Sequence, residues 1–380
     1  TFYDLLVFRI QQTKRSIRTN FATSLQELDI PFKDLQMGDE IGAGAYGRVN
    51  MATWNGLTVA VKSVCLDSPK DYKNFQREIS CLVSLRHPSC IQCYGISQDE
   101  ELGKQSFSIV MEYCREGSLY DAIRQESTCL YRWEFLLRLF YDISRGMQYV
   151  HGRGVIHRDL KPDNIMLISK TNIIQKDSSV AKIVDFGISR FLSSNSSTGN
   201  RTLCGTPGIF APEVFTQDYS FPCDVFSFGV TMYKTIFKAE PFPNIAAVVD
   251  YKRMINEDYR PEILFPLPPL VHEILNECLT YDPDCRPTFK QITCFLRNCM
   301  LRWKIDPSTF PPLPCEYELE KLPPSEFSDL LVLKAPSHSG RRMKSRKYSD
   351  NLLLRPAQFS PSRDRKSPRE LLPSDYKVDL

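Results

Sequence analysis

The spacing of apolar residues predicts strands in the first third of the chain. The stretch 35–52 predicts two strands joined by a glycine-rich turn, and 57–64 predicts a third strand that contains Lys62. After Pro88, the short apolar runs 91–96 and 107–113 predict two more strands. This part of the chain is therefore expected to form a small β-rich unit.

One helix is expected within this unit, over 72–85. Its apolar residues Phe75, Ile79 and Leu82 recur at i, i+4 and i+7, which places them on one face of a helix. Glu78 lies on that same face. Because a carboxylate that faces a core is costly unless a cation neutralises it, a partner from another element is expected, and Lys62 is the natural candidate.

Helices dominate the pattern farther along the chain. The stretch 133–151 carries an apolar stripe, whereas 224–237 is apolar on nearly every side. A helix without a polar face is normally buried, so 224–237 is expected to form the central pillar of a larger helical unit. The two patterns together predict an α+β protein with two lobes, a small β-rich lobe with one helix and a larger α-helical lobe.

The two ends of the chain differ from this middle part. Residues 1–30 mix apolar and basic positions at roughly helical spacing, which favours a surface helix, with a membrane-facing or partner-facing helix as the alternative. After about residue 303, prolines, serines and basic residues replace the apolar runs. Such a segment buries too little surface to offset its ordering entropy, so 320–380 is expected to be mostly disordered.

Composition is that of an ordinary globular protein. Of its 380 residues, 42% are hydrophobic and 24% charged, which excludes disorder throughout, and a net charge of +3 gives no reason to expect nucleic-acid binding. Residues 321–380 hold 13 Lys or Arg against 7 Asp or Glu, so the basic character belongs to the tail. No apolar run approaches the ~18 to 20 residues that span a bilayer, and no transmembrane segment is expected.

Thirteen cysteines are scattered through the chain with no secretory leader before them, which indicates reduced thiols and a cytoplasmic protein. The only close pair is Cys90 and Cys93, and no second pair follows at zinc-finger spacing. Packing in the core is expected for both thiols, with a metal site as the alternative. The chain begins with Thr1, as a fragment or a processed form would.

A glycine-rich segment occupies the first predicted turn. Gly42, Gly44 and Gly47 have the spacing G-x-G-x-x-G, which lets backbone amides approach phosphate oxygens. A dinucleotide-binding fold uses the same spacing, but there a helix and then an acidic residue follow. Here a strand follows, and the later charged residue is Lys62, so the pattern favours a different kind of phosphate site.

The most informative stretch is 157–164, His-Arg-Asp-Leu-Lys-Pro-Asp-Asn, followed by Asp-Phe-Gly at 185–187. Together they supply a candidate base and two metal-binding side chains, which phosphoryl transfer from a magnesium nucleotide requires. With the glycine-rich segment, Lys62 and Glu78 in the same order, the chain resembles eukaryotic protein kinases over about 36–300.

This resemblance implies the bilobal protein kinase fold and a division of the chain. The kinase domain would cover 36–300, with the small lobe over about 36–112 and the large lobe over about 116–300. An N-terminal extension, 1–35, would precede it, and a Pro/Ser/basic tail, 301–380, would follow it and be mostly disordered.

The resemblance also implies a role for each catalytic residue. Asp159 would be the base that accepts or orients the proton of the substrate hydroxyl, and Lys161 would stabilise charge on the transferring phosphate. Lys62, held by Glu78, would bind the α- and β-phosphates of the nucleotide.

The expected cofactors are ATP and Mg²⁺, with Mn²⁺ as a substitute for the metal. Asn164 and Asp185 would hold the metal ions. Met111 would gate the back of the pocket, and backbone groups of Glu112 and Cys114 would bond adenine, the thiol of Cys114 being a packing group rather than a reactive one. The expected ATP-binding residues are Ile41, Gly42, Ala43, Gly44, Ala45, Tyr46, Gly47, Val49, Ala60, Lys62, Met111, Glu112 and Cys114.

Two features indicate the hydroxyl that is phosphorylated. Lys161-Pro162 follows the candidate base in the form found in serine/threonine kinases, and Gly205-Thr206-Pro207 supports the same specificity. The expected function is transfer of the γ-phosphate of ATP to Ser or Thr of protein substrates in intracellular signalling. A kinase-fold scaffold without catalysis and a dual-specificity kinase are the alternatives.

Further segments look like the tyrosine-kinase-like branch of the family, whose members mostly phosphorylate Ser and Thr. By that likeness, Glu213 and Arg286 would form a buried ion pair, and Asp224 would anchor the backbone of the catalytic loop. Tyr233-Lys234 departs from the Trp-Glu that is common there, which puts the subfamily in question and not the chemistry. The segments that carry the likeness are 205–213, 224–230 and 282–289.

Regulation is expected in the serine-rich and threonine-rich stretch 189–206, where an upstream kinase would add a phosphate that Arg158 binds. The regulatory candidates are Arg158, Ser197, Thr198, Thr202 and Thr206. The connection 167–181 is longer than a hairpin needs and is expected to protrude. In the tail, Ser-Pro pairs at 360 and 367 beside basic residues indicate a substrate of other kinases or a contact for an acidic partner, with a solvated linker as the alternative.

Overall fold

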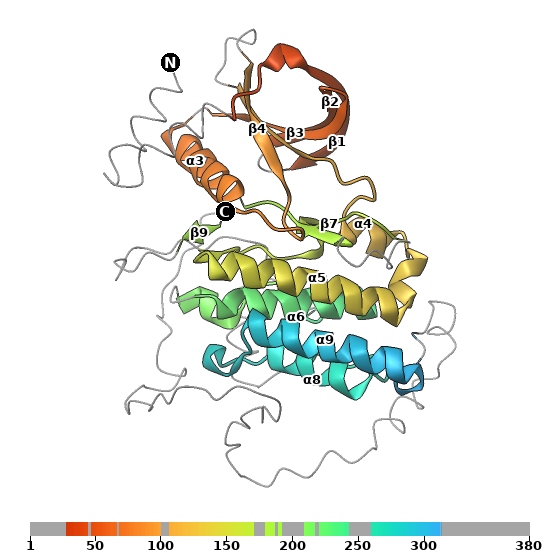
Figure 1. Ribbon diagram of the computed structural model, residues 1–380. Coiled ribbons are helices and arrows are strands. Elements are labelled where there is room, and N and C mark those ends of the chain that lie inside the picture. The colour runs from red at the N-terminus through yellow and green to blue at the C-terminus, as the bar shows by residue number, and fades with distance from the viewer. Residues whose placement is uncertain are drawn as a thin grey trace.

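Figure 1 shows the computed structural model of the chain, which describes residues 28–44, 47–66, 68–99, 106–170, 179–186, 189–191, 209–216, 220–242, 260–311 and 313. A small lobe built on a β-sheet lies next to a larger lobe of stacked helices (Figure 1). The predicted α+β, two-lobed architecture is therefore confirmed.

The small lobe is built on a five-stranded sheet in which every pair of neighbours is antiparallel. Its spatial order is β1-β2-β3-β5-β4. The register places Lys62 opposite Ile109 and Ala60 opposite Met111. The strands are β1 (Leu35–Gly44), β2 (Gly47–Trp54), β3 (Leu57–Cys65), β4 (Cys93–Asp99) and β5 (Ser106–Glu112).

The helix α3 (Pro69–Ser84) packs against this sheet through its apolar face. The ring of Phe75 lies 5.6 Å from that of Phe107 on β5, and Ile79 and Leu82 are also buried. The helix begins three residues before its predicted start because Ser68 and Asp71 form a capping box, in which each side chain accepts a hydrogen bond from the backbone of the other.

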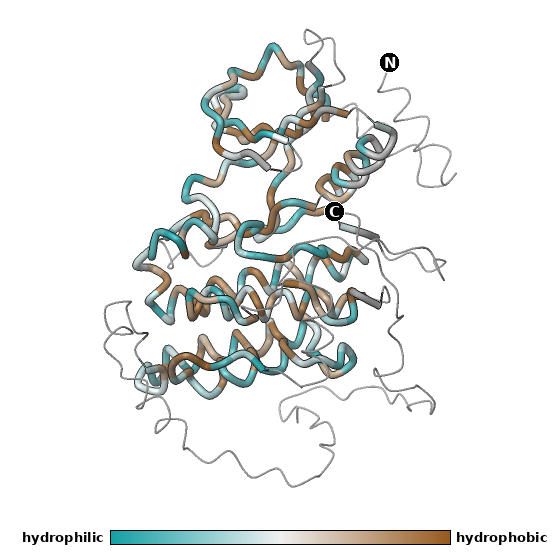
Figure 2. The backbone as a smooth tube through the Cα atoms, turned by 180° about the vertical axis from the view of Figure 1, so that it is seen from behind, coloured by the Kyte–Doolittle hydropathy of each residue, from teal (hydrophilic) through white to brown (hydrophobic). Residues whose placement is uncertain are grey.

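The large lobe stacks helices around α6, which is buried on all sides, as its pattern predicts. The helices α5 and α9 lie side by side next to it (Figure 1). Hydrophobic and hydrophilic residues alternate along these helices, as expected where one face meets the core (Figure 2). The helices are α4 (Leu119–Arg124), α5 (Trp133–Gly152), α6 (Pro222–Phe237), α8 (Pro269–Cys278) and α9 (Phe289–Ile305).

Short elements complete both lobes and carry the predicted catalytic segments. Two small antiparallel sheets pair β6 with β9 and β7 with β8, so that the segment between β6 and β7 and the residues after β8 leave from adjacent strands. The strands are β6 (Val155–Ile156), β7 (Ile165–Leu167), β8 (Ala181–Ile183) and β9 (Arg190–Phe191). The 3-10 helices are η1 (Phe32–Asp34), η2 (Thr128–Tyr131), η3 (Pro162–Asn164), η4 (Pro212–Thr216), η5 (Pro283–Cys285) and η6 (Pro307–Thr309).

The segment before β4 joins the small lobe to the large lobe. The backbone N–H of Ile91 donates to the carbonyl of Ile183 at 2.9 Å, and the N–H of Ile183 donates to the carbonyl of Ser89 at 2.9 Å. Because residues 89–91 pair with β8, strand β4 begins only at Cys93, two residues after its predicted start.

The first described residues, 28–30, lie along the edge strand β4. Ile30 and Ile96 pair through their backbones, and a side chain on Gly95 would clash with the carbonyl of Leu28, so residues 28–30 cover the edge of β4 instead of extending the helix expected over 1–30. The rest of that expected helix, 1–27, lies outside the described residues, as do 314–380 of the tail and 171–178 of the expected protruding loop.

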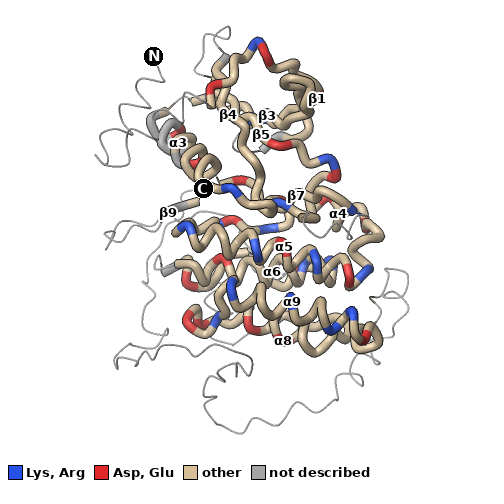
Figure 3. The backbone as a smooth tube through the Cα atoms, in the orientation of Figure 1, with Lys and Arg blue, Asp and Glu red and all other residues tan. Residues whose placement is uncertain are grey.

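Charged residues of both signs are scattered over the described backbone (Figure 3). The surplus of basic residues in 321–380 lies outside it. Among the helices that the structure describes, none is both long and apolar enough to cross a bilayer.

Ten of the cysteines in the described ranges are free thiols. Burial raises the pKa of Cys90 and of Cys93 to about 12, so both stay protonated and pack in the core. Within the described residues no group of three or more His, Cys, Asp or Glu side chains is placed to hold a metal ion.

Candidate active site

A cavity of about 490 Å³ lies where the small lobe meets the large lobe, and most of the predicted site residues line it. Of the predicted residues, those that line the cavity are Ile41, Gly42, Gly47, Val49, Ala60, Lys62, Glu78, Met111, Glu112, Cys114, Asp159, Lys161, Asn164 and Asp185. Ala45 and Tyr46 lie outside the described residues, and of Ala43 and Gly44 the structure describes the backbone alone.

Lys62 on β3 is one of the two lysines in the described lining of the cavity. Its Nζ lies 2.6 Å from Oε1 of Glu78 on α3 and 3.4 Å from Oδ1 of Asp185, which follows β8. Burial disfavours the charged ammonium, but the two carboxylates outweigh this effect and hold the pKa of Lys62 above its ordinary value. The lysine therefore carries a positive charge, paired with carboxylates of both lobes.

Asp159 also lines the cavity and lies in the loop that follows β6. Nζ of Lys161 lies 2.9 Å from its Oδ2. The side-chain amide of Asn164 donates to the same Oδ2 at 2.9 Å and to the backbone carbonyl of Asp159 at 2.8 Å. Because the amide nitrogen of Asn164 is used in this way, its amide oxygen is the atom that the side chain offers to a cation.

The backbone of this loop is held by Asp224 at the start of α6. Its Oδ2 accepts from the N–H of His157, and its Oδ1 accepts from the N–H of Arg158, both at 2.8 Å. The ring Nε2 of His151 lies 2.8 Å from Oδ2. Burial opposes ionisation of Asp224, yet its partners, His151 above all, lower its pKa below the ordinary value, so it is an anion that fixes Arg158 at φ 71°.

A second loop places Asp185 at the cavity. Asp185 also has a left-handed backbone, with φ 60°. Next to it, the N–H of Val184 donates to the carbonyl of Asn164 at 3.0 Å, and Nε2 of His157 lies 3.0 Å from the carbonyl of Val184. The ring of Phe186 is fully buried and lies 5.0 Å from the ring of His157. These contacts tie the two loops together.

The hinge between the lobes follows β5. The backbone N–H of Glu112 donates to the carbonyl of Gln92 at 2.9 Å, and the carboxylate of Glu112 lies 2.8 Å from Nζ of Lys182 on β8. These two contacts hold the start of the hinge in place. Burial raises the pKa of Cys114 to about 12. Its thiol is therefore protonated, as expected for a packing residue.

Two glycines of the glycine-rich segment, Gly42 and Gly47, line the cavity. Gly47 has φ +127°, and a Cβ atom there would clash with the carbonyl oxygen of Ser63 on β3. Only glycine fits this position, because an L-residue is strained at this φ and has no room for its side chain.

The family is decided by comparison with known proteins. The family model described as "Protein kinase domain" matches residues 35–295, which is more than half of the chain. The chain belongs to the protein kinase family. The loop 157–164, the glycine-rich segment and the Lys62–Glu78 pair thus lie within a kinase domain.

Several curated kinases are similar to this chain over most of its length. A "Putative serine/threonine-protein kinase/receptor" of Acanthamoeba polyphaga mimivirus is 33% identical over 282 residues, which cover 72% of this chain and 16% of that protein. The "Probable serine/threonine-protein kinase drkD" of Dictyostelium discoideum is 33% identical over 273 residues, 70% of this chain and 20% of that protein. The "Probable serine/threonine-protein kinase drkA" of the same organism is 31% identical over 268 residues, which cover 69% of this chain and 39% of that protein. The chain thus spans well under half the length of these relatives.

The kinase cavity also has wall residues that the sequence motifs do not single out. Met166 is one of them. On β7 it stands between the buried Ile165 and Leu167, so its side chain points to the opposite face of the strand from theirs. The two-residue period of a strand could have predicted this. Leu82 lies one turn after Glu78 on α3 and follows from helix periodicity in the same way. The others are Ile91, Tyr113, Ser118, Asp121, Asp163 and Val184.

The charges of the cavity fit a nucleotide that arrives with a divalent cation. The described lining contains two cationic side chains, Lys62 and Lys161, and six carboxylates. A bare triphosphate would be repelled by this excess of negative charge, whereas oxygen atoms of carboxylates and amides are the ligands that Mg²⁺ prefers. The carboxylates are Glu78, Glu112, Asp121, Asp159, Asp163 and Asp185.

Outside the cavity, the expected ion pair of the large lobe is present. Nη1 and Nη2 of Arg286 donate to the carboxylate of Glu213 at 2.6 and 2.9 Å. Arg158, the expected phosphate-binding residue, lies beside Asp159. The regulatory candidates Ser197, Thr198, Thr202 and Thr206 lie outside the described residues.

Proposed function

We propose that this chain is a serine/threonine protein kinase, which transfers the γ-phosphate of ATP to Ser or Thr of protein substrates. The observation that carries the proposal is the arrangement of two groups around one cavity. Lys62 with Glu78 and Asp185 forms the first, and Asp159 with Lys161 forms the second. Family membership supports the reaction class.

Each group has a task in the proposed reaction. Lys62 binds the α- and β-phosphates, and Glu78 keeps the ammonium in place. The carboxylate of Asp159 orients the substrate hydroxyl and takes its proton as the oxygen attacks the γ-phosphorus, while the bond from that phosphorus to the β–γ bridging oxygen breaks and ADP leaves. The ammonium of Lys161, 2.9 Å from that carboxylate, stabilises negative charge on the transferring group.

Asn164 and Asp185 are the residues proposed to hold the metal. Held by these two side chains, Mg²⁺ would supply positive charge beside the phosphates of the nucleotide. The amide oxygen of Asn164 and the carboxylate of Asp185 suit this ion or its substitute Mn²⁺. The backbone of Glu112 and Cys114 is proposed to bond adenine, and Met111 to limit the depth of the pocket.

Serine/threonine specificity is supported by two observations. Lys161 and Pro162 follow the proposed base, in the form found in serine/threonine kinases. The similar proteins of Dictyostelium discoideum carry serine/threonine-protein kinase in their names. The proposed kinase domain covers 36–300, between the N-terminal extension and the tail. The proposed compartment is the cytoplasm, where the free thiols of this protein stay reduced.

The test compares the chain with its Asp159→Asn variant in a reaction with Mg²⁺, γ-labelled ATP and a generic substrate protein. Loss of the base should lower phosphate incorporation by about 10²- to 10⁴-fold, with the label of the unaltered chain found on phosphoserine and phosphothreonine. ATP affinity, measured by calorimetry, should stay within a few-fold, because Lys62 and the hinge remain.

Equal incorporation by both proteins would refute the role of Asp159. Label on phosphotyrosine alone would refute the specificity. A folded chain that binds ATP with Mg²⁺ but transfers no phosphate to any substrate, itself included, would favour a scaffold instead.

Regulation by an upstream kinase is part of the proposal. A phosphate within 189–206 would contact Arg158, whose neighbour Asp159 is the proposed base, and would thereby order the segment. Mass spectrometry of the active enzyme should find phosphate on Ser197, Thr198 or Thr202. Alanine at all three should lower activity at least tenfold. An unmodified segment together with full activity of the alanine variant would exclude this mode of control.

A further inference from the structure

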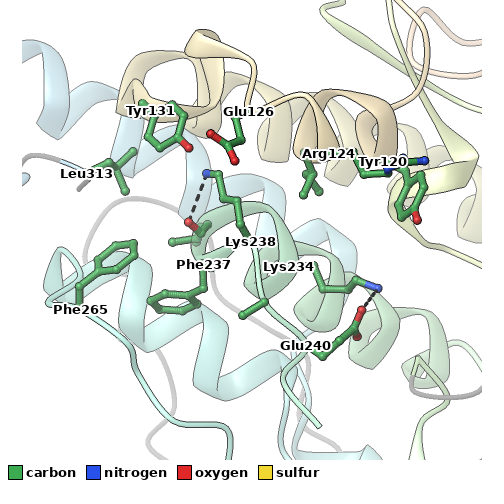
Figure 4. Close-up of a pocket in the computed structure, with 13 residues that line it drawn as sticks. Tyr120, Arg124, Glu126, Tyr131, Lys234, Phe237, Lys238, Glu240, Phe265 and Leu313 are labelled. Atoms are coloured by element: carbon green, nitrogen blue, oxygen red, sulfur yellow. Dashed lines mark hydrogen bonds and ion pairs between the residues drawn. The ribbon is translucent and has the colours of Figure 1, made fainter. Parts of the chain in front are cut away.

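A second cavity, of about 360 Å³, lies in the large lobe and shares no residue with the cavity of the candidate active site. Figure 4 shows it between α4 and η2 on one side and the end of α6 on the other, with Phe265 and Leu313 at one end. Nothing in the proposed reaction uses it.

The cavity has an apolar end and a charged end. Phe237, Phe265 and Leu313 lie together at the first, and Arg124 and Lys234 lie toward the second (Figure 4). Counting Lys238, Glu126 and Glu240 as well, the lining is net positive by one charge. Such a lining suits a ligand that combines bulky apolar groups with carboxylates.

Lys238 forms part of the wall and does not serve as an anion site itself. Its Nζ donates to the carbonyls of Leu130 and Thr235 at 3.2 and 2.8 Å and lies 4.7 Å from the centre of the Tyr131 ring. Lys234 lies 2.7 Å from Glu240, which is itself more than half exposed. Arg124, on an exposed turn of α4, is therefore the cation most available to a ligand.

The chain itself leads into the apolar end. After α9 and η6, the ring of Phe310 packs edge-on against Trp133 and Trp303, at 5.9 and 5.3 Å. The indole N–H of Trp133 then donates to the carbonyl of Pro311 at 2.7 Å. Leu313 is 9% exposed and lines the cavity, so the residues that come next start at its wall.

The sequence after Leu313 has the composition that the cavity suits. Residues 316–320 are Glu-Tyr-Glu-Leu-Glu. In an extended chain, Tyr317 and Leu319 lie on one side and the three glutamates lie on the other. Four residues span at most ~14 Å, so Tyr317 stays close to Leu313. This short connection keeps the effective concentration of the segment at the cavity high.

We propose that residues 316–320 of this chain dock in this second cavity, with Tyr317 and Leu319 against its apolar walls and the glutamates toward Arg124 and Lys234. The tail would then have a fixed attachment to the large lobe. The helix α4 gives the attachment a consequence for the other cavity: Tyr120, Ile123 and Arg124 line the second cavity, whereas Asp121 of the same helix and its N-cap residue Ser118 line the first. Docking would hold the rim of the nucleotide cavity in place.

The test uses the full chain with p-benzoylphenylalanine in place of Tyr317. On irradiation, mass spectrometry should find crosslinks within one molecule to Tyr120, Ile123, Phe237 or Phe265. The same group in place of Tyr348, farther along the tail, is the matched control and should give no crosslink to these four residues.

A charge exchange tests the polar part of the contact. Arg124→Glu, at an exposed position, should lower the crosslink yield from position 317 about two- to fivefold, and a further Glu318→Arg should restore it. Crosslinks elsewhere on the lobe, or none, would overturn the proposal, and so would crosslinks between two molecules, which would show a second copy in the cavity. None of these results depends on kinase activity.

Discussion

At the scale of single residues, the candidate site depends on two kinds of contact. One kind fixes an unusual backbone conformation, and the other keeps a buried side chain charged. Asp224 fixes the left-handed backbone of Arg158, and the carboxylates around Lys62 keep the ammonium charged despite its burial. The identity of these residues is visible in the sequence motifs. Their charge states follow from neighbours that come from distant parts of the chain.

His87 is a residue whose neighbours make stability depend on pH. Burial, together with the positive charges of Arg145 and Lys182, lowers its pKa to about 4. The ring stacks on Tyr149 at 5.2 Å, and Nδ1 accepts from the N–H of Ser89. As pH falls from 6.5 to 4, His87 becomes protonated in the unfolded chain but stays neutral in the folded chain. The free energy of unfolding therefore decreases over this pH range.

We therefore expect His87→Gln to lose less stability than the unaltered chain between pH 6.5 and 4. Urea unfolding at several pH values measures this difference, and an NMR titration of His87 gives its pKa directly. His272→Gln, at an exposed position, controls for the loss of a histidine. Parallel stability curves for His87→Gln and the unaltered chain would contradict the expectation.

At the scale of elements, periodicity locates helices and strands, while contacts decide where they end. Strand β4 begins at Cys93 rather than 91 because the preceding residues pair with β8 of the other lobe. Helix α3 begins at Pro69 because Ser68 caps it. Capping residues can be recognised in the sequence, but pairing between lobes cannot.

Helix α5 contains two glycines that illustrate the same difference. A Cβ atom at Gly146 would lie 2.7 Å from Cδ1 of Ile183 and 3.0 Å from the carbonyl oxygen of Ser89, whereas one at Gly152 would meet nothing within 4 Å. Gly146→Ala is therefore expected to destabilise the protein by about 1–3 kcal/mol through overpacking.

Gly152→Ala in the same helix is the matched control. It should change stability little or raise it by up to ~1 kcal/mol, since alanine favours helix more than glycine does. Denaturant unfolding of both variants measures the contrast. Equal effects of the two substitutions would show that the close approach of α5 to β8 does not limit the space at Gly146.

At the scale of the whole molecule, contacts between residues far apart in the sequence hold the large lobe together. The guanidinium of Arg286, which is 0% exposed, bonds Glu213 and the carbonyls of Pro222 and Thr280 and lies 5.0 Å from the ring of Phe226. It thus connects the segment after α8 to the segment before α6.

Removing this guanidinium leaves a carboxylate and carbonyls without their partner. Arg286→Met is expected to cost about 3–5 kcal/mol of unfolding free energy. Arg132→Ala removes a pair with Glu134 in which both side chains are about half exposed, and should cost at most ~1 kcal/mol. Thermal and denaturant unfolding compare the two, and a similar small loss in both would mean that burial adds nothing to the Arg286 pair.

Local sequence patterns were enough to predict the class of the molecule, its two lobes and most residues of the candidate site. Periods of two and of 3.6 residues and short motifs are local signals, and Lys62, Asp159 and Asp185 stand in such motifs. The contacts of these residues, such as the 3.4 Å approach of Lys62 to Asp185, depend on the tertiary fold. The same holds for the position of Leu313 in the wall of the second cavity and for the lowered pKa of His87. The physical reason is that distances and burial depend on which distant segments pack together, and no local pattern contains that information.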